Sequence, residues 1–132
     1  MGYMLDTNIC IFAIKKKHPK LLHNLRDHSV LEICISSITL SELYYGACKS
    51  EYREKNLTAL EKMLTTIEVS PFDERAASAY GEIRANLERK GQIIGPLDTL
   101  IAAHAMSLNA ILITNNTKEF LRVKGLAVED WC

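Results

Sequence analysis

Short apolar runs alternate along the chain with longer segments in which apolar residues recur every three or four positions. The runs have the length of buried strands, and the longer segments have the periodicity of helices packed on a core. The expected strands cover residues 3–5, 31–35, 67–69, 110–114 and 126–128. The expected helices cover 9–14, 19–25, a segment from within 36–39 to about 49, 51–65, 73–90, 96–108, and a short helix that contains 120–121. Strands that alternate with helices predict an α/β fold, with a central parallel sheet of four to five strands flanked by helices on both faces.

Proline, glycine and small polar residues mark the ends of several expected helices. Asn8 is available to cap the first helix, and Asp73 can cap the long helix that ends before Gly91. Pro19 and Pro96 each suit the first position of a helix. These signals support the helix boundaries drawn from periodicity alone.

The length of 132 residues is enough for one domain with a real core, and no linker, repeat or low-complexity segment divides it. We therefore expect one domain over residues 1–132. The 16 acidic and 16 basic residues balance. A protein that grips nucleic acid through backbone charge alone is usually basic. If this one handles RNA or DNA, local patches or metal ions must supply the positive charge.

The apolar runs and the cysteines bear on where the protein works. No apolar stretch approaches the roughly 20 residues needed to span a membrane. Asp6 breaks the first apolar run, so we expect no signal peptide. Cys10, Cys34, Cys48 and Cys132 lack the spacing of metal or redox motifs. We expect them to be small core residues, with Cys132 a terminal thiol, in a reducing cytoplasm.

A set of polar residues falls at strand exits or helix starts and fits poorly as ordinary surface. Asp6 and Asn116 each follow an apolar strand, whereas Glu42 and Asp98 lie early in helices. The small apolar residues that share a helix stripe with Asp98 leave room above its carboxylate. Turn formation or helix capping would also explain each position, Glu42 through a capping box at 39–42. Because a parallel sheet brings strand exits to one edge, we expect the side chains to converge there.

Carboxylates that converge at one edge repel one another unless a cation lies between them. Ligands that are all oxygens select hard cations, Mg²⁺ or Mn²⁺, over zinc. A carboxylate cluster with such ions hydrolyses phosphodiesters, because the metal activates water and offsets charge on the leaving oxygen. The pattern therefore predicts a metal-dependent hydrolase in which no lysine or histidine has to act as the base.

The combined motifs extend over essentially the whole chain. They are MLDTN at 4–8, ISSITLSEL at 35–43, GPLDTLIA at 95–102, LITNN at 112–116 and EDWC at 129–132. Together they resemble the PIN-domain ribonucleases, and closely the VapC toxins of bacterial toxin–antitoxin pairs, with a C-terminus similar to the enteric members. The resemblance implies a PIN fold and a metal-dependent endoribonuclease. In this family the residues that match Asp6, Glu42 and Asp98 bind the metal, so Mg²⁺ or Mn²⁺ is the implied cofactor.

The sequence departs from the family pattern at one position. The fourth acidic position, often aspartate, is Asn116 here, which removes a charge and puts a second metal in doubt. Glu119, one helical turn further on, could lend a carboxylate instead. Thr7 and Thr114 resemble the hydroxyls that line the site in this family, and Asn115 is grouped with them.

The resemblance also implies partners. These are a cognate VapB-type antitoxin whose tail lies across the active site, a toxin homodimer, and a hetero-oligomer with the antitoxin. Enteric relatives cut initiator tRNA in its anticodon loop, so RNA, and initiator tRNA in particular, is the implied substrate.

Other functions match the sequence less well. A haloacid-dehalogenase-type phosphatase needs a second aspartate two residues after the first, where Asn8 stands. A receiver domain needs an acidic pair after the first strand and a lysine after the last core strand, and neither pattern is found. A catalytically weak PIN fold that only binds a partner is disfavoured by the intact carboxylates. His104, on the apolar stripe of its helix, is expected to be a core residue.

Overall fold

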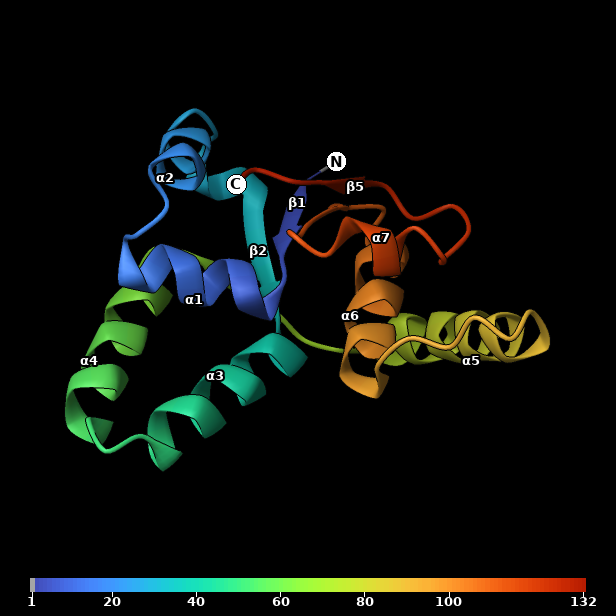
Figure 1. The fold of residues 1–132 in the computed structure, drawn as a ribbon, viewed down its shortest axis with the longest axis horizontal. Helices are drawn as coiled ribbons and strands as arrows, with labels where there is room; N and C mark the ends of the chain where they lie inside the picture. The colour runs from blue at the N-terminus through green and yellow to red at the C-terminus, as the bar shows by residue number, and fades with distance from the viewer. Residues whose placement is uncertain (1) are drawn as a thin grey trace.

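The computed structural model describes residues 2–132, in which parallel strands alternate with helices (Figure 1). The strands are β1 (Tyr3–Leu5), β2 (Ile33–Ser36), β3 (Glu68–Ser70), β4 (Ile111–Ile113) and β5 (Val128–Glu129). The helices are α1 (Thr7–Lys15), α2 (Pro19–Arg26), α3 (Ser37–Lys49), α4 (Arg53–Leu64), α5 (Glu74–Arg89), α6 (Pro96–Ser107) and α7 (Thr117–Phe120), with a 3₁₀ turn η1 (Val30–Glu32) before β2. The predicted α/β class is confirmed. Across residues 2–132, every helix is too short or too polar to span a membrane.

The strand order places the end of β1 at a topological switch point. All the strands are parallel, in the order β3-β2-β1-β4-β5. The chain moves from β1 outward to β3 and then returns to the other side of β1 for β4 and β5. In such sheets the crevice at the carboxyl ends of the strands, where the order reverses, is the usual place for a site. Leu5 is in register with Ile113, so Asp6 and Thr114 leave the sheet side by side.

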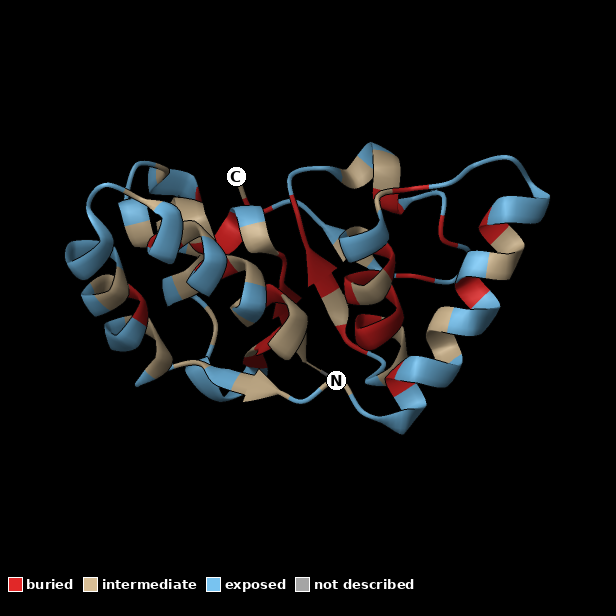
Figure 2. Ribbon diagram, turned by 90° about the horizontal axis from the view of Figure 1, so that it is seen from below, coloured by how far each residue is buried: buried red, intermediate tan, exposed pale blue. Residues whose placement is uncertain are grey.

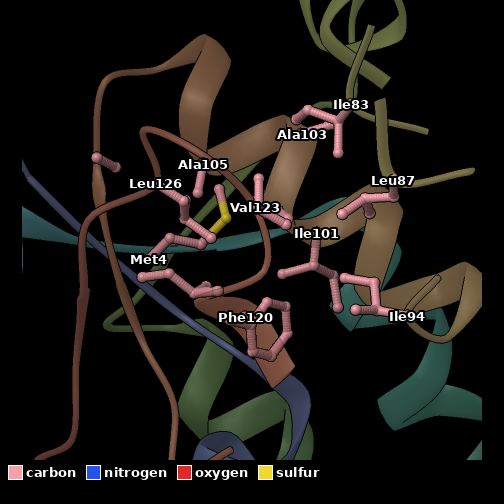
Figure 3. Close-up of a cluster of buried hydrophobic side chains, with 13 residues drawn as sticks. Met4, Ile83, Leu87, Ile94, Ile101, Ala103, Ala105, Phe120, Val123 and Leu126 are labelled. Carbon is pink, nitrogen blue, oxygen red and sulfur yellow. The ribbon is translucent and has the colours of Figure 1, made fainter. Parts of the chain in front are cut away.

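Side chains that alternate along β1 build a core on each face of the sheet. Met4 contributes to the core formed with α5, α6 and α7, part of which is drawn in Figure 3. Tyr3 and Leu5 contribute to the opposite core, formed with α1, α2, α3 and α4. Figure 2 shows the buried residues gathered around the sheet and the inner helix faces, with exposed residues on the outer helices. The sheet is therefore covered on both faces, as predicted.

Most predicted helix ends are confirmed. Asp73 caps α5, since its side chain accepts a hydrogen bond from the Ala76 N–H at 3.1 Å. Pro19 and Pro96 begin α2 and α6. Gly91 follows α5 with a φ of +65°, in the left-handed region that a residue without Cβ adopts freely.

The cap of the first helix differs from the prediction. Asp6, not Asn8, is the N-cap of α1, because its Oδ1 accepts a hydrogen bond from the Ile9 N–H at 2.9 Å. The helix consequently begins at Thr7, and Asn8 is an exposed residue of its first turn. Both are common capping residue types, and the point at which β1 ends decides between them.

Two strand boundaries are also corrected. The strand expected over 31–35 starts later, because Val30–Glu32 form a 3₁₀ turn that carries Leu31 into solvent, 91% exposed. The last strand begins at Val128, since Leu126 packs into the core instead of pairing in the sheet.

The cysteines are free thiols. Cys10 is buried as expected, and burial raises its pKa. Cys48 lies exposed on α3, so the expectation that it is a core residue is wrong. Its position on the outward face of the helix is not visible in the spacing of the cysteines.

Candidate active site

Asp6 lies at the carboxyl end of β1 and is almost completely buried, with 4% of its surface exposed. Burial raises the pKa of Asp6; the Thr114 side chain and the backbone N–H that Asp6 caps lower it by hydrogen bonding. The negative charges of Glu42 and Asp130 raise that pKa further. Asp6 is therefore a fixed carboxyl group with acidic neighbours, at the switch point of the sheet.

Glu42 reaches the same edge from the second turn of α3. Its Oε1 accepts a hydrogen bond from the Thr7 hydroxyl at 2.6 Å, and the Thr7 and Thr39 hydroxyl oxygens are 3.4 Å apart. The capping-box explanation is wrong, because Ser36 caps α3 by accepting from the Ile38 N–H at 3.0 Å. The side chain of Glu42 is thus oriented by α1 and has no capping role in its own helix.

Asp98 lies in the first turn of α6, three residues after the N-cap residue Gly95. Within residues 2–132 no backbone N–H donates to its side chain, so helix capping does not account for it. Burial raises the pKa of Asp98 to about 6, together with the charges of Glu119, Asp6 and Glu42 in that order. These three charges come from separate segments of the chain, so carboxylates that are distant in sequence act on Asp98 here.

The acidic group that acts most strongly on Asp98 belongs to Glu119, on α7, which lies beside α6 in Figure 1. Its Oε1 accepts a hydrogen bond from the Gly95 N–H at 3.0 Å, and its Oε2 accepts one from the side-chain amide of Asn116. The acidic group beside Asp98 is therefore the Glu119 carboxylate. Asn116, at the fourth position of the family pattern, hydrogen-bonds to that carboxylate through its amide.

Asn116 does not occupy the geometry expected of it. It was expected to follow its strand as Asp6 follows β1, but β4 ends at Ile113 and the residue in register with Asp6 is Thr114. Thr114 is buried, and its Oγ1 accepts a hydrogen bond from the Asn116 N–H at 3.0 Å. Asn115, also expected to line the site, is exposed at the same edge.

No basic side chain neutralises this cluster in the part of the chain that the structure describes. The ion pairs found there are His23–Asp27, Arg53–Glu54 and Arg84–Glu88. Within residues 2–132, no group of three or more His, Cys, Asp or Glu side chains is arranged to hold a metal ion. The donors are nonetheless all oxygens, the type that Mg²⁺ and Mn²⁺ prefer. Their mutual repulsion, visible in the raised pKa of Asp98, is what a divalent cation would relieve.

His104 is a core residue, as predicted, with 1% of its surface exposed. Its Nδ1 lies 2.7 Å from the Ser36 hydroxyl, and burial lowers its pKa. The bond joins α6 to the start of α3. It therefore helps to fix the helix that carries Asp98 relative to the helix that carries Glu42.

Comparison with known proteins places this geometry in a family. Residues 3–126 match the PIN-domain model. The chain belongs to the PIN-domain family. Within that family it is 50% identical to the tRNA(fMet)-specific endonuclease VapC of Shigella flexneri, over 99% of this chain and 98% of the relative. It is 47% identical to the ribonuclease VapC2 of Rickettsia felis, over the same shares of the two chains.

Solved structures of VapC-family proteins have the same fold as this PIN domain. DNA-bound VapBC from Salmonella typhimurium superposes with a TM-score of 0.95 at 46% identity, over 100% of this chain and 99% of that one. VapBC2 from Rickettsia felis, bound to a fragment of its promoter, gives 0.92 at 45% identity over the whole of both chains. The resemblance drawn from the motifs is therefore confirmed.

Family membership bears on the metal. PIN-domain ribonucleases are generally dependent on divalent metals. The carboxylate oxygens described above are ligands of the type that such metals prefer. In this PIN domain, reasoning from the sequence did not single out Gly95, whose N–H donates to Glu119, and named Glu119 only as a residue that could lend a carboxylate in place of Asn116. The sequence did carry a signal for Glu119, because side chains three residues apart, such as those of Asn116 and Glu119, can hydrogen-bond to each other at a helix. The role of Gly95 depends on the approach of α7 to α6, which no local pattern shows.

Proposed function

We propose that this chain is the toxin of a toxin–antitoxin pair, and that it is a Mg²⁺- or Mn²⁺-dependent endoribonuclease that cuts initiator tRNA in the anticodon loop. The observation that carries the proposal is the convergence of Asp6, Glu42, Asp98 and Glu119 at the switch point, without a basic partner in residues 2–132. The Shigella and Salmonella relatives, 50% and 48% identical over nearly the whole chain, are named tRNA(fMet)-specific endonucleases. Their names support the choice of substrate.

Each acidic residue has a distinct part in the proposed site. Asp6, Glu42 and Asp98 would hold the divalent ion, and Glu119 adds negative charge beside Asp98. A bound ion would supply Lewis acidity there, which would activate water and offset charge on the scissile phosphate. The chain itself supplies orientation: the cap of α1 fixes Asp6, and the Thr7 hydroxyl fixes one oxygen of Glu42. Asp98, with its pKa raised to about 6, would take up a proton below about pH 6 when no cation is bound.

The test of the activity is direct. Purified protein is incubated with total tRNA and Mg²⁺ or Mn²⁺, and the new RNA ends are mapped. We expect one cut, in the anticodon loop of initiator tRNA, abolished by EDTA and restored by Mg²⁺ or Mn²⁺. Zn²⁺ should restore it poorly, because no Cys or His joins the cluster. Full activity in EDTA would contradict the proposal and indicate a metal-free mechanism.

An apolar groove next to the site supports the antitoxin half of the proposal. The groove lies between α1, α3 and α4, and has a volume of about 270 Å³. Its lining includes Ile11, Ile14, Leu43, Ala47 and Leu60, with Glu42 at its margin. An apolar stretch of an antitoxin tail would dock there, as in other groove-binding peptides. A basic side chain of the same tail, best an arginine, would then reach the carboxylates and form a bidentate contact. The solved VapBC complexes with this fold support such a partner.

A further inference from the structure

Both carboxylate oxygens of Glu119 are held by uncharged donors. The Gly95 N–H donates to Oε1 at 3.0 Å, and the Asn116 side chain donates to Oε2. Because a carboxylate only accepts hydrogen bonds, Asn116 must present its NH₂ group to Glu119. The two donors come from different segments, one just before α6 and one just before α7, so the carboxylate joins the starts of two helices.

The bonds around Asn116 continue toward Asp6. The Asn116 backbone N–H donates to Thr114 Oγ1 at 3.0 Å, and the Thr114 side chain is hydrogen-bonded to Asp6. A chain of hydrogen bonds thus extends from Asp6 through Thr114 and Asn116 to Glu119. Its donors are hydroxyl and amide groups, so Glu119 is oriented without losing its negative charge.

Gly95 lies next to the two carboxylates of Asp98 and Glu119. A Cβ placed on this residue would lie 3.6 Å from Asp98 Oδ2 and 3.9 Å from Glu119 Oε1. The Gly95 backbone thus lies beside both acidic groups, at a distance where a Cβ would make only ordinary van der Waals contact, and its N–H orients one of them. An aspartate at position 116 would have no proton to donate at neutral pH and would repel Glu119.

We infer that Asn116 is a positioning residue that acts through Glu119, and that it is not a metal ligand in its own right. The amide of Asn116 and the carboxylate of Glu119 together do what a single acidic residue at position 116 would do. The inference rests on the proposed function in one respect, namely that Glu119 faces a divalent cation. The bonding itself is a property of the protein alone.

A double-mutant cycle tests the inference through Mn²⁺ binding, measured by calorimetry on the metal-free protein. Asn116→Ala should weaken Mn²⁺ binding roughly tenfold, the usual cost of losing a group that orients a ligand. In a Glu119→Gln background the same change should weaken it by less than about twofold, because the group it orients has lost its charge. An equal loss in both backgrounds would show that Asn116 binds the ion independently, and no loss in either would show that its amide has no role. Asn86→Ala, which removes an amide on α5, is the matched control.

A second measurement does not depend on metal. Hydrogen exchange of the Gly95 amide, followed by NMR in EDTA, should become faster in Asn116→Ala than in the wild type or in Asn86→Ala, because Glu119 is then held at one oxygen only. Unchanged exchange would overturn the inference whatever the Mn²⁺ data show. If the wild type neither binds Mn²⁺ nor cuts tRNA, the proposed function fails, and the Gly95 exchange rate alone decides whether Asn116 positions Glu119.

Discussion

Asp98 is the residue whose protonation reports on the crowding of the carboxylates. Its pKa is raised to about 6 from the ordinary aspartate value of 3.8, by burial first and then by Glu119, Asp6 and Glu42. The folded protein therefore binds this proton more tightly than the unfolded chain does. It follows that Asp98 lowers the stability of the metal-free protein as pH rises from about 4 to about 6, and that the loss persists above that range.

We expect Asp98→Asn to stabilise the metal-free protein by about 1 kcal/mol near pH 7.5, a value discounted because the side chain is only half-buried. The gain should vanish near pH 4, where the wild-type carboxyl is protonated as well. Urea unfolding in EDTA at both pH values measures it. An equal gain at both would mean that the charge of Asp98 is not the cause.

Asp6 caps α1 and, in the proposed site, would hold the ion, and a pair of variants can separate the two roles. Asp6→Asn keeps an oxygen that accepts the Ile9 N–H, so the cap of α1 survives, whereas Asp6→Ala loses the cap at a cost of about 1 kcal/mol. Both should lose tRNA cleavage by roughly a hundredfold or more, since even groups that only orient metal ligands contribute 10–100-fold. Thermal unfolding and cleavage assays on the two proteins give the comparison. Cleavage at the wild-type rate by Asp6→Asn would remove Asp6 from the proposed site.

At the scale of elements, the junction of α3 and α6 sets the spacing of the acidic residues. Ser36 caps α3 through the Ile38 N–H and also bonds to the buried His104 of α6 at 2.7 Å. We expect Ser36→Ala to cost about 2 kcal/mol, because a helix cap is lost and a buried ring nitrogen loses its partner.

Ser29→Ala is the matched control for this prediction, since Ser29 caps the η1 turn through the Leu31 N–H and is exposed. Its loss should cost a few tenths of a kcal/mol by urea unfolding. If Ser36→Ala costs no more than Ser29→Ala, the bond between Ser36 and His104 does not stabilise the fold.

Elements were predicted well wherever hydrophobic periodicity is strong. The short apolar run of β1 and the apolar positions at helical spacing in α5 and α6 predict strand and helix types without tertiary information. Boundaries were missed where several residues could cap a helix. Asn8 and Asp6 compete for the start of α1, and residues 36–39 for the start of α3. Contacts with distant elements, such as the bond from Ser36 to His104, decide between them.

The candidate site was predictable from the sequence only in part. Asp6 and Asp98 follow from the rule that strand exits and helix starts meet at one edge of a parallel sheet. The position of the Glu119 carboxylate beside Asp98, with the Asn116 amide further along the edge, depends on where β4 ends and on the contact between α6 and α7. Such contacts between separated segments leave no periodic signal in the sequence.

At the scale of the whole molecule, balanced charge and a local acidic cluster have to be considered together. The 16 acidic and 16 basic residues cancel overall, yet the ion pairs within residues 2–132 leave the acidic edge without a partner. A free toxin would attract cations to this edge from any source. An inhibitor that carries an arginine would use the same attraction, and an apolar anchor in the adjacent groove would give it affinity that salt does not screen.

The anchor can be tested with glycines that lie in two helices of this fold. Gly46 lines the groove, and a Cβ built on it meets no atom within 4 Å; the same is true of Gly81 on α5, away from the groove. We expect Gly46→Phe to fill the groove and weaken binding of the cognate antitoxin by roughly tenfold or more, about 1.4 kcal/mol. Gly81→Phe should leave that binding unchanged, and both should raise helix stability slightly, since glycine is a poor helix former. Titration of each toxin variant with the antitoxin, alongside thermal unfolding, separates the two effects. If both variants bind as the wild type does, the antitoxin tail lies elsewhere, and the groove between α1, α3 and α4 does not hold it.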